Sequence, residues 1–448
     1  MKQIIYIFII FFLFACSDKE QDTQLEEITF NITNEISVKG GTLNIIGSGF
    51  TEELDISIKD IVLPKEIIST NEMNLIIPPL EAATYRLNFK KNGRNIGYID
   101  NFKIKALELK YKKLSNDTLP ESLIFSKLFA FPKLGILYFN NNSLETEYLE
   151  RDENGDYSQN SDRFPKFSGE LNQILELDYD NDGDNDYLLC SSEKNHSIFW
   201  NNSDGVYIKS NILIDFSCSK AIYENGELAI LGYDKDEENN DIRFIKIFDN
   251  NLFTQKESYD ISYLDKIYDF HIADLDKDGI NELFILTKNS DSSEIVVLQN
   301  ENSNIENIKL DQKELTKFCF IDLENDGDED LFIISKNQDL LLLNDGLSYF
   351  YDYTSLSIPI DNSEGRALKC KDLNIDGYKD VIIGNYNSLN RLYQNEQDSW
   401  FSDQTLSLDI ENSYTENIFT KDIDNDGDDE IIFVDEKVGL KIYKLDEE

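Results

Sequence analysis

The feature that most constrains the fold of this chain is an acidic nine-residue pattern that occurs five times. Its clearest copy has acids at Asp274, Asp276, Asp278 and Glu282, the first, third, fifth and ninth positions, around Gly279 at the sixth. Oxygen ligands at this spacing on a tight turn suit Ca²⁺, and glycine permits a bend that a Cβ atom would obstruct. The pattern predicts about five structural calcium sites.

The predicted ligands come from the first, third, fifth, seventh and ninth positions of each copy. The seventh position would contribute its backbone carbonyl, so its side chain is not restricted to an acid. The predicted metal-binding residues are Asp178, Asp180, Asp182, Asp184, Asp186, Asp274, Asp276, Asp278, Ile280, Glu282, Asp322, Glu324, Asp326, Asp328, Asp330, Asp372, Asn374, Asp376, Tyr378, Asp380, Asp422, Asp424, Asp426, Asp428 and Glu430.

An EF-hand loop begins in the same way, but it needs a Glu at the twelfth position and a helix behind it. The twelfth positions here are Leu189, Ile285, Ile333, Ile383 and Phe433. The segments around them are short, apolar and rich in β-branched residues, which is typical of buried strands. Each loop is therefore expected to join one strand to the next in an all-β fold.

The copies recur with a period of about 50 residues, since their first aspartates stand at 274, 322, 372 and 422. The longer gap that follows Asp178 accommodates one repeat without the acidic loop, at residues 219–231, where an Asn225-Gly226 hairpin replaces the loop. Residues 127–138 form another acid-free copy. An apolar strand that ends in Asn also recurs, at Asn140, Asn201, Asn300, Asn344 and Asn395.

Seven repeats of about four short strands each predict a seven-bladed β-propeller over residues 107–448. The repeats resemble the FG-GAP/VCBS family, and this resemblance implies calcium loops between the first two strands of a blade. The last repeat is one strand short. Residues 107–113 are expected to supply that strand and so to remove an exposed sheet edge.

Residues 28–106 read as a separate small β domain. Glycines at 40, 41, 47 and 49 punctuate an alternating apolar segment that ends at Phe50, and further strand patterns follow at residues 76–79 and 84–89. This segment resembles the IPT/TIG family, which implies an immunoglobulin-like β-sandwich that serves as a spacer or an interaction domain.

The N-terminus has the pattern of an export signal. Lys2 precedes an apolar run that is too short to span a bilayer, and residues 1–15 are interpreted as a signal peptide. Residues 13–16 resemble a bacterial lipobox, which implies lipidation of Cys16; an ordinary secretion signal is the alternative. Residues 16–27 comprise the lipidated Cys and an acidic tether, in which residues 17–22 resemble the surface-export signals of Bacteroidota lipoproteins. The chain is therefore expected on the outer membrane, facing outwards.

Cysteine and histidine indicate no reactive centre. Cys190, Cys218, Cys319 and Cys370 show no CxxC spacing and are expected to be buried free thiols. The chain has two histidines, His196 and His271, which are expected to be structural.

A formal net charge of −45 makes nucleic acid an unsuitable partner. No serine protease triad, histidine metal cluster or neuraminidase-type Asp box is present. We therefore expect no enzyme but a lipid-anchored surface protein that binds an extracellular glycan or protein, for adhesion or recognition. The alternative is an extracellular polysaccharide lyase or glycosidase on a calcium-stabilised propeller, because carboxylate pairs are abundant.

Overall fold

The computed structural model describes residues 30–446 with short gaps, at residues 33–34, 60, 115–122, 124–125, 127, 133–134, 153–155, 161, 203–204, 212–213, 236–237, 239–240, 250–253, 289–291, 300–302, 305–306, 311–313, 347–348, 398–399, 409 and 425. The predicted signal peptide, Cys16 and the tether lie outside the described residues. Two compact units are present: residues up to Glu108 with Asp372–Gly377, and Leu109–Lys371 with Tyr378–Glu448.

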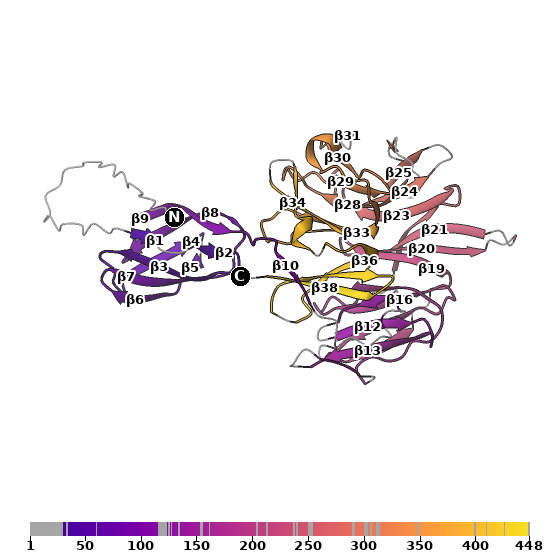
Figure 1. Ribbon diagram of the computed structural model, residues 1–448, viewed down its shortest axis with the longest axis horizontal. Coiled ribbons are helices and arrows are strands. Elements are labelled where there is room, and N and C mark those ends of the chain that lie inside the picture. Colours follow the sequence, from indigo (N-terminus) through magenta and orange to yellow (C-terminus); the bar gives the residue numbers. More distant parts are fainter. Residues whose placement is uncertain are drawn as a thin grey trace. The chain divides into compact units, whose positions relative to one another are not determined.

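The first unit contains two sheets (indigo to purple in Figure 1). One has the order β1 (Phe30–Ile32), β3 (Gly41–Gly47), β7 (Glu72–Ile77), β6 (Lys65–Ser69). The other has the order β2 (Ile36–Ser37), β9 (Arg94–Lys105), β8 (Ala83–Lys91), β4 (Leu54–Ile58), β5 (Ile61–Val62). The pairings are antiparallel except for β2 with β9.

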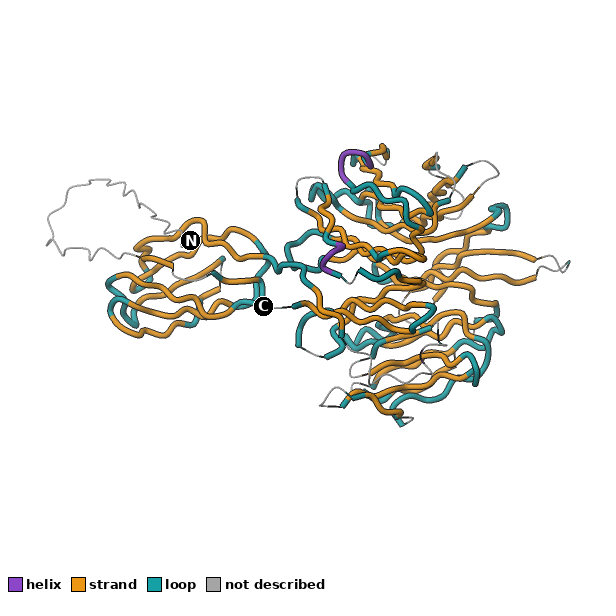
Figure 2. The backbone as a smooth tube through the Cα atoms, in the orientation of Figure 1, coloured by secondary structure: helices purple, strands orange, loops and turns teal. Residues whose placement is uncertain are grey.

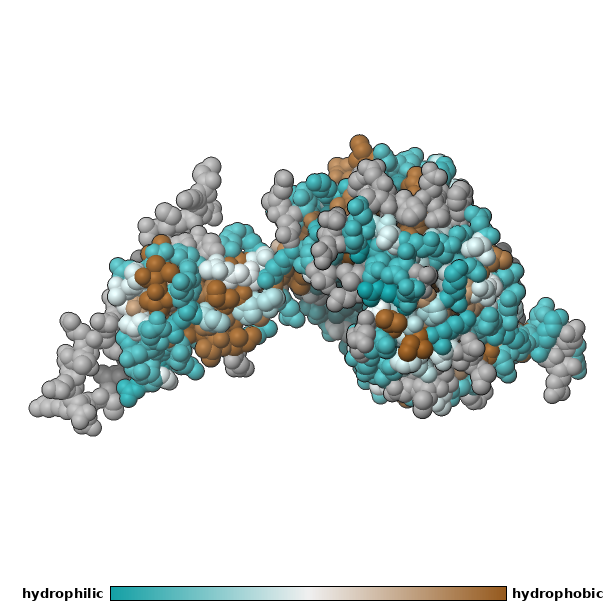
Figure 3. Space-filling view, turned by 90° about the horizontal axis from the view of Figure 1, so that it is seen from below, coloured by the Kyte–Doolittle hydropathy of each residue, from teal (hydrophilic) through white to brown (hydrophobic). Residues whose placement is uncertain are grey.

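Both sheets of the first unit contribute to one hydrophobic core. Strand β3 buries Leu43 and Ile45, which lie two positions apart, and β8 buries Leu87 and Phe89 in the same way. This period of two is what a strand with one buried face requires. Several large apolar residues remain exposed on this unit (brown in Figure 3), among them Ile46, Val62, Ile68 and Ile76.

The second unit is built from successive antiparallel sheets (Figures 1 and 2). The first three are β11 (Phe129–Ala130), β12 (Gly135–Asn140), β13 (Glu145–Arg151), β14 (Tyr157–Gln159); β15 (Leu171–Leu177), β16 (Asp186–Ser191), β17 (Ser197–Asn201), β18 (Tyr207–Asn211); and β19 (Ser217–Glu224), β20 (Glu227–Lys235), β21 (Asp241–Asp249), β22 (Thr254–Asp260). Then come β23 (Lys266–Ala273), β24 (Glu282–Lys288), β25 (Ser293–Gln299), β26 (Ser303–Asn304), β27 (Ile308–Leu310); and β28 (Leu315–Ile321), β29 (Asp330–Ser335), β30 (Leu340–Asn344), β31 (Phe350–Asp352).

The last strands of the chain form one eight-stranded sheet. Its members are β32 (Glu364–Lys371), β33 (Asp380–Ser388), β34 (Arg391–Asn395), β35 (Phe401–Asp403), β36 (Ser413–Lys421), β37 (Glu430–Asp435), β38 (Gly439–Leu445) and β10 (Tyr111–Lys113). Two four-stranded groups merge here because β33 pairs with β36, at Tyr386 with Tyr414 and at Ser388 with Ser413. The period of the repeats did not predict this join.

Strand β10 pairs antiparallel with β38, from Tyr111 opposite Leu445 to Lys113 opposite Tyr443. The segment before the first repeat thus completes the C-terminal group, as the sequence predicted for residues 107–113. The pairing covers an edge of β38 that would otherwise offer unpaired N–H and C=O groups.

Hydrophobic clusters in the second unit span neighbouring sheets. One joins Leu137 and Leu189, from the first and second sheets, and another joins Leu188 and Ile230, from the second and third. Comparable clusters link the third sheet with the fourth, the fourth with the fifth, and the fifth with the strands of the sixth group. A further cluster packs Ile136 of β12 against Ile432 of β37. The chain therefore curls so that its last sheet packs on its first.

Of two local predictions, one is confirmed and the other is wrong. Asn225 and Gly226 have φ of +50° and +76° and turn directly from β19 into β20, as predicted for a tight hairpin without an acidic loop. Asn140 was grouped with Asn201, Asn344 and Asn395, which end the third strands of their sheets. That grouping was wrong, because Asn140 ends β12, the second strand of its sheet.

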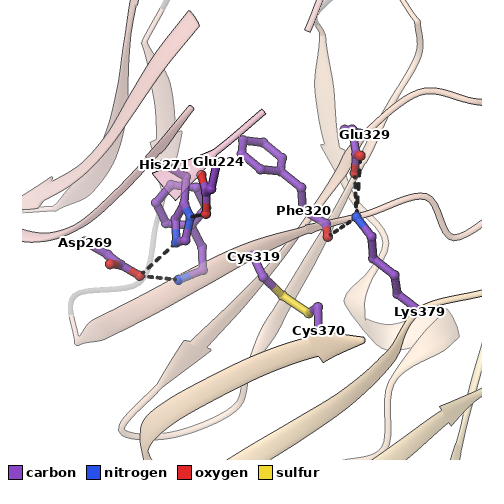
Figure 4. Close-up of a disulfide and its surroundings, with 9 residues drawn as sticks. Glu224, Asp269, His271, Cys319, Phe320, Glu329, Cys370 and Lys379 are labelled. Carbon is purple, nitrogen blue, oxygen red and sulfur yellow. Dashed lines mark hydrogen bonds and ion pairs between the residues drawn. A yellow bond between two sulfur atoms is a disulfide. The ribbon is translucent and has the colours of Figure 1, made fainter. Parts of the chain in front are cut away.

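The prediction of free thiols was also wrong. Cys190 bonds Cys218. Cys319 bonds Cys370, as Figure 4 shows. The paired cysteines lie on neighbouring sheets, and no sequence pattern such as CxxC marks contacts of this kind. Disulfides of this kind persist in oxidising compartments.

Helix is rare in the described chain. It includes α1 (Thr354–Ser357) and the 3₁₀ turn η2 (Thr405–Ser407). Within the described residues, no helix has the length and apolar character needed to cross a membrane.

Candidate metal sites

The five acidic loops each connect the first and second strands of a sheet, and they share one backbone conformation. The glycine at the sixth position has φ between +86° and +99°, a region that favours glycine, in all five loops: Gly183, Gly279, Gly327, Gly377 and Gly427. Its N–H donates to the first aspartate at 2.8–3.1 Å, which closes the turn.

The ninth-position acid ties the start of the loop to the start of the second strand. Glu282 accepts a hydrogen bond from Leu275 N at 2.8 Å, and Glu430 accepts one from Ile423 N at 2.9 Å. Asp186 and Asp330 do the same with the residue after their first aspartate. These acids lie at the first residue of a buried strand, so each loop carries a desolvated carboxylate at its base.

Three loops bring their first, third and ninth acids together, with one oxygen of each within 4.8 Å of the others. The three groups are Asp178, Asp180, Asp186; Asp274, Asp276, Glu282; and Asp422, Asp424, Glu430. Like charges at this separation repel one another, and a divalent cation would offset that repulsion.

Unsatisfied buried oxygens show that these carboxylates fit a cation. Asp274 Oδ1 and Glu282 Oε1 in one loop, and Asp424 Oδ1 and Glu430 Oε1 in another, are buried and accept no hydrogen bond from the described residues. A buried carboxylate oxygen without a donor is costly, and a hard cation is the partner that carboxylates on such a loop suit best.

The pKa values of the ninth-position acids reflect the same gathering of buried carboxylates. Burial, opposed by a backbone N–H and reinforced by the neighbouring acids, raises the pKa of both Glu282 and Glu430 to about 7. Burial likewise raises the pKa of Asp186 to about 6. A cation would favour the charged forms again.

The other two loops are arranged differently. Among the described residues, neither the loop at Asp322 nor the loop at Asp372 brings three acids within this distance. In the first, both oxygens of Asp330 accept backbone hydrogen bonds, from Leu323 and Asn344, an arrangement that Asp186 of a converging loop shares. In the second, the third position is Asn374, whose amide donates to Asp376 at 3.0 Å.

The fifth and seventh positions serve the turn itself. The fifth-position carboxylates accept a hydrogen bond from the N–H of the seventh residue, from Asp184 to Asp182, Ile280 to Asp278, Asp328 to Asp326 and Asp428 to Asp426. Tyr378, the seventh residue of its loop, receives a hydrogen bond on its hydroxyl from Asn325 at 3.2 Å.

Several lysines that the sequence pattern did not single out contact the loops, Lys444 and Lys277 among them. Lys444 of β38 lies 2.5 Å from Asp424 Oδ2 and also pairs with Asp426. Lys277 pairs with Asp328 of the next loop. Both are distant in sequence from the acids they meet, so the acidic spacing contains no signal for them. These ammonium groups offset part of the loop charge.

The fold and loops together define a β-propeller-like protein with acidic loops suited to metal ions. A family model described as an FG-GAP-like repeat matches residues 372–433. No curated protein matches the chain.

Three solved structures show distant likenesses to this chain. A structural-genomics protein of unknown function from Bacteroides thetaiotaomicron has 9% identity and a TM-score of 0.42, with 94% of this chain and 98% of that chain covered. An Agrocybe aegerita lectin for non-reducing terminal N-acetylglucosamine has 15% identity and a TM-score of 0.40, covering 80% and 90%. A Bacillus licheniformis rhamnogalacturonan lyase has 10% identity and a TM-score of 0.38, covering 91% and 89%.

Proposed function

We propose that this chain is a calcium-stabilised, lipid-anchored surface protein that binds an extracellular ligand. The observation that carries the calcium role is the set of buried, hydrogen-bond-deficient oxygens in the loops at Asp274 and Asp422. When bound, Ca²⁺ would neutralise converging carboxylates and tie the first strand of a sheet to the second, which is a structural role.

The three converging loops are the first candidates for calcium. Their holders would be Asp178, Asp180, Asp186; Asp274, Asp276, Glu282; and Asp422, Asp424, Glu430. The loops at Asp322 and Asp372 remain predicted sites on their acid spacing alone. Elemental analysis of the purified chain after dialysis against buffered Ca²⁺ distinguishes a content near three from one near five. A calcium-free protein under these conditions contradicts the proposal.

In its finer detail, the proposed fold is a seven-bladed propeller preceded by an IPT/TIG immunoglobulin-like domain. The propeller is supported by the repeats, by the clusters that link consecutive sheets, and by the packing of Ile136 against Ile432. Two sheets around one core support the smaller domain. Its exposed apolar residues favour an interaction role over a purely passive spacer. An experimental structure of the full chain tests the blade count directly.

The proposed location rests on the N-terminal sequence. Cys16 follows a short apolar run and Ala15, and acidic residues follow it, which together suit lipidation and export to the outer surface. Cys16→Ser is expected to release the protein from the membrane fraction, whereas Cys190→Ser, remote from the anchor, should stay there. Retention of the Cys16→Ser protein in membranes contradicts the anchor.

The binding role is proposed because neither the sequence pattern nor the acidic loops offer a set of catalytic groups. The full chain in detergent, applied to glycan and matrix-protein arrays with and without Ca²⁺, should bind a defined class of ligand. Depolymerisation of a polysaccharide, abolished by one substitution outside the loops, would instead assign the chain to the enzymes.

A further inference from the structure

A cavity of about 450 Å³ lies within the second unit, and its lining includes Glu329 and Lys379 from two of the acidic loops. Its walls come chiefly from β15, β19, β23, β28, β32 and β36, the first strands of successive sheets. The volume corresponds to roughly fifteen water molecules at about 30 Å³ each, which is room for a monosaccharide or a small organic acid.

One wall carries a connected group of charged side chains. Lys220 forms an ion pair with Asp269, and His271 lies between Asp269, at 3.4 Å, and Glu224, at 2.6 Å. Figure 4 shows His271 held between the two carboxylates. Burial lowers the pKa of His271, but Glu224 and Asp269 outweigh that effect and raise it to about 9. His271 is therefore cationic at neutral pH.

Lys317 of β28, by contrast, does not belong to this group of ion pairs. It is only partly exposed, and it makes no hydrogen bond or ion pair with any residue of the described chain. The nearby carboxylate of Asp269 is already engaged by Lys220, His271 and the N–H of Phe318. Burial lowers the pKa of Lys317, as expected for an ammonium group that lacks a close anion.

The cavity as a whole is positive. Its lining includes the cations Lys220, Lys317, Lys369, Lys379 and His271 and the anions Glu224, Asp269 and Glu329. Five positive charges less three negative charges leave a local charge of +2, in a chain whose formal net charge is −45. Lys379 and Glu329 have side chains 40% and 35% exposed, so solvent reaches this end of the lining.

Apolar groups complete the lining. Phe318 and Phe320 stand with their rings edge-on to His271, at centroid distances of 4.7 and 6.3 Å, and Ile222 and Leu368 lie on neighbouring strands. A lining that combines apolar surface with a few polar groups is typical of small-molecule sites.

We propose that this cavity binds a small organic anion of monosaccharide size, whose carboxylate or phosphate group pairs with Lys317. The anion would supply the partner that Lys317 lacks, and the body of the ligand would pack on Phe318 and Phe320. This inference deepens the binding role proposed above and rests on it, but Lys317 itself lies outside the acidic loops and the anchor.

The test is calorimetric titration of the full chain, in detergent and with Ca²⁺ present. The probes are D-glucuronate, inorganic phosphate, and D-glucose as the neutral counterpart of glucuronate. At least one anion should bind, and glucose should bind about tenfold more weakly or not at all, because a charge-assisted hydrogen bond is lost. Preference for glucuronate or for phosphate identifies which oxyanion the site takes.

Two variants make the result specific to Lys317. Lys317→Gln should weaken binding of the preferred anion by about tenfold or more, whereas Lys256→Gln, which removes an exposed lysine outside the cavity, should leave it unchanged. Anion affinity that is equal in the wild type and in Lys317→Gln overturns the proposal, as does failure of both anions to bind.

A second measurement guards against misfolding. Lys317→Met should melt at the wild-type temperature or above, because it removes a partly desolvated charge that has no ion-pair partner among the described residues, and it should still lose the anion. Protection of Lys317 from an acylating reagent by the preferred anion, read by mass spectrometry, gives an independent signal. If neither anion binds in the titrations but the chain still binds a ligand on the arrays, the cavity site is refuted and the surface-binding role stands.

Discussion

The acidic loops and the cavity of the second unit differ in the sign of the charge that lacks a partner: carboxylates in the loops, and an ammonium group in the cavity. Glu282 and Glu430 carry buried oxygens without donors, whereas the partly exposed Lys317 has no hydrogen-bond or ion-pair partner among the described residues. Removing a charge from water without giving it a partner is costly, most of all for the buried loop oxygens. The loops are therefore suited to cations and the cavity to anions.

The largest expected effect on stability comes from removing calcium from the acidic loops. Removal of Ca²⁺ with EDTA should lower the melting temperature by several degrees, because each native-state site contributes on the order of 3 kcal/mol at a hundredfold excess of ion over Kd. Calorimetric melts in EDTA and in millimolar Ca²⁺ check this. Mg²⁺ at the same concentration is the control, and superimposable melts in all three buffers would refute calcium stabilisation.

The next effect concerns the cavity wall. Replacing Cys319 and Cys370 by alanine opens a bond that spans 51 residues, and the chain-entropy argument gives a loss of about 2–4 kcal/mol. Since both cysteines line the cavity, anion affinity should fall while calcium content stays constant. Calorimetry and elemental analysis measure the two quantities. The matched control is the Cys190→Ala/Cys218→Ala pair, and loss of calcium only in the first pair would count against separate sites.

A smaller effect should distinguish the converging loops from the loops at Asp322 and Asp372. Asp274→Asn should remove about one calcium and on the order of 1–3 kcal/mol of stability, because its oxygens converge with those of Asp276 and Glu282. Asp322→Asn, in a loop without such a group, should have less effect on both. Calcium titration and thermal melts of the two variants decide the point, and equal losses would support five equivalent sites.

The smallest effect is a pH dependence of the cavity. The pKa of His271 rises from an ordinary 6.5 to about 9 through Glu224 and Asp269, after the opposing effect of burial. Its stabilisation is therefore complete below pH 6.5 and is lost as pH rises through about 9. Lys220 and Lys317 line the same cavity. Denaturant melts in saturating Ca²⁺ should show declining stability over this window, and the decline should flatten in His271→Gln.

The all-β repeat, the acidic turns and the Asn225-Gly226 hairpin could be predicted from the sequence because they depend on neighbours within about nine residues. Alternating apolar residues determine which face of a strand is buried, and the position of Gly279 determines where its loop bends. The strand that pairs with β38 was also predictable, since the last repeat lacked one.

Only the tertiary structure decided the pairings between repeats. Cys319 meets Cys370, and His271 meets Glu224, across separations of 51 and 47 residues that no local pattern encodes. The isolation of Lys317 likewise depends on which carboxylates the neighbouring strands have already engaged. Local spacing thus determined what could bind a cation, whereas the packing of first strands around the cavity decided which charges were left without partners.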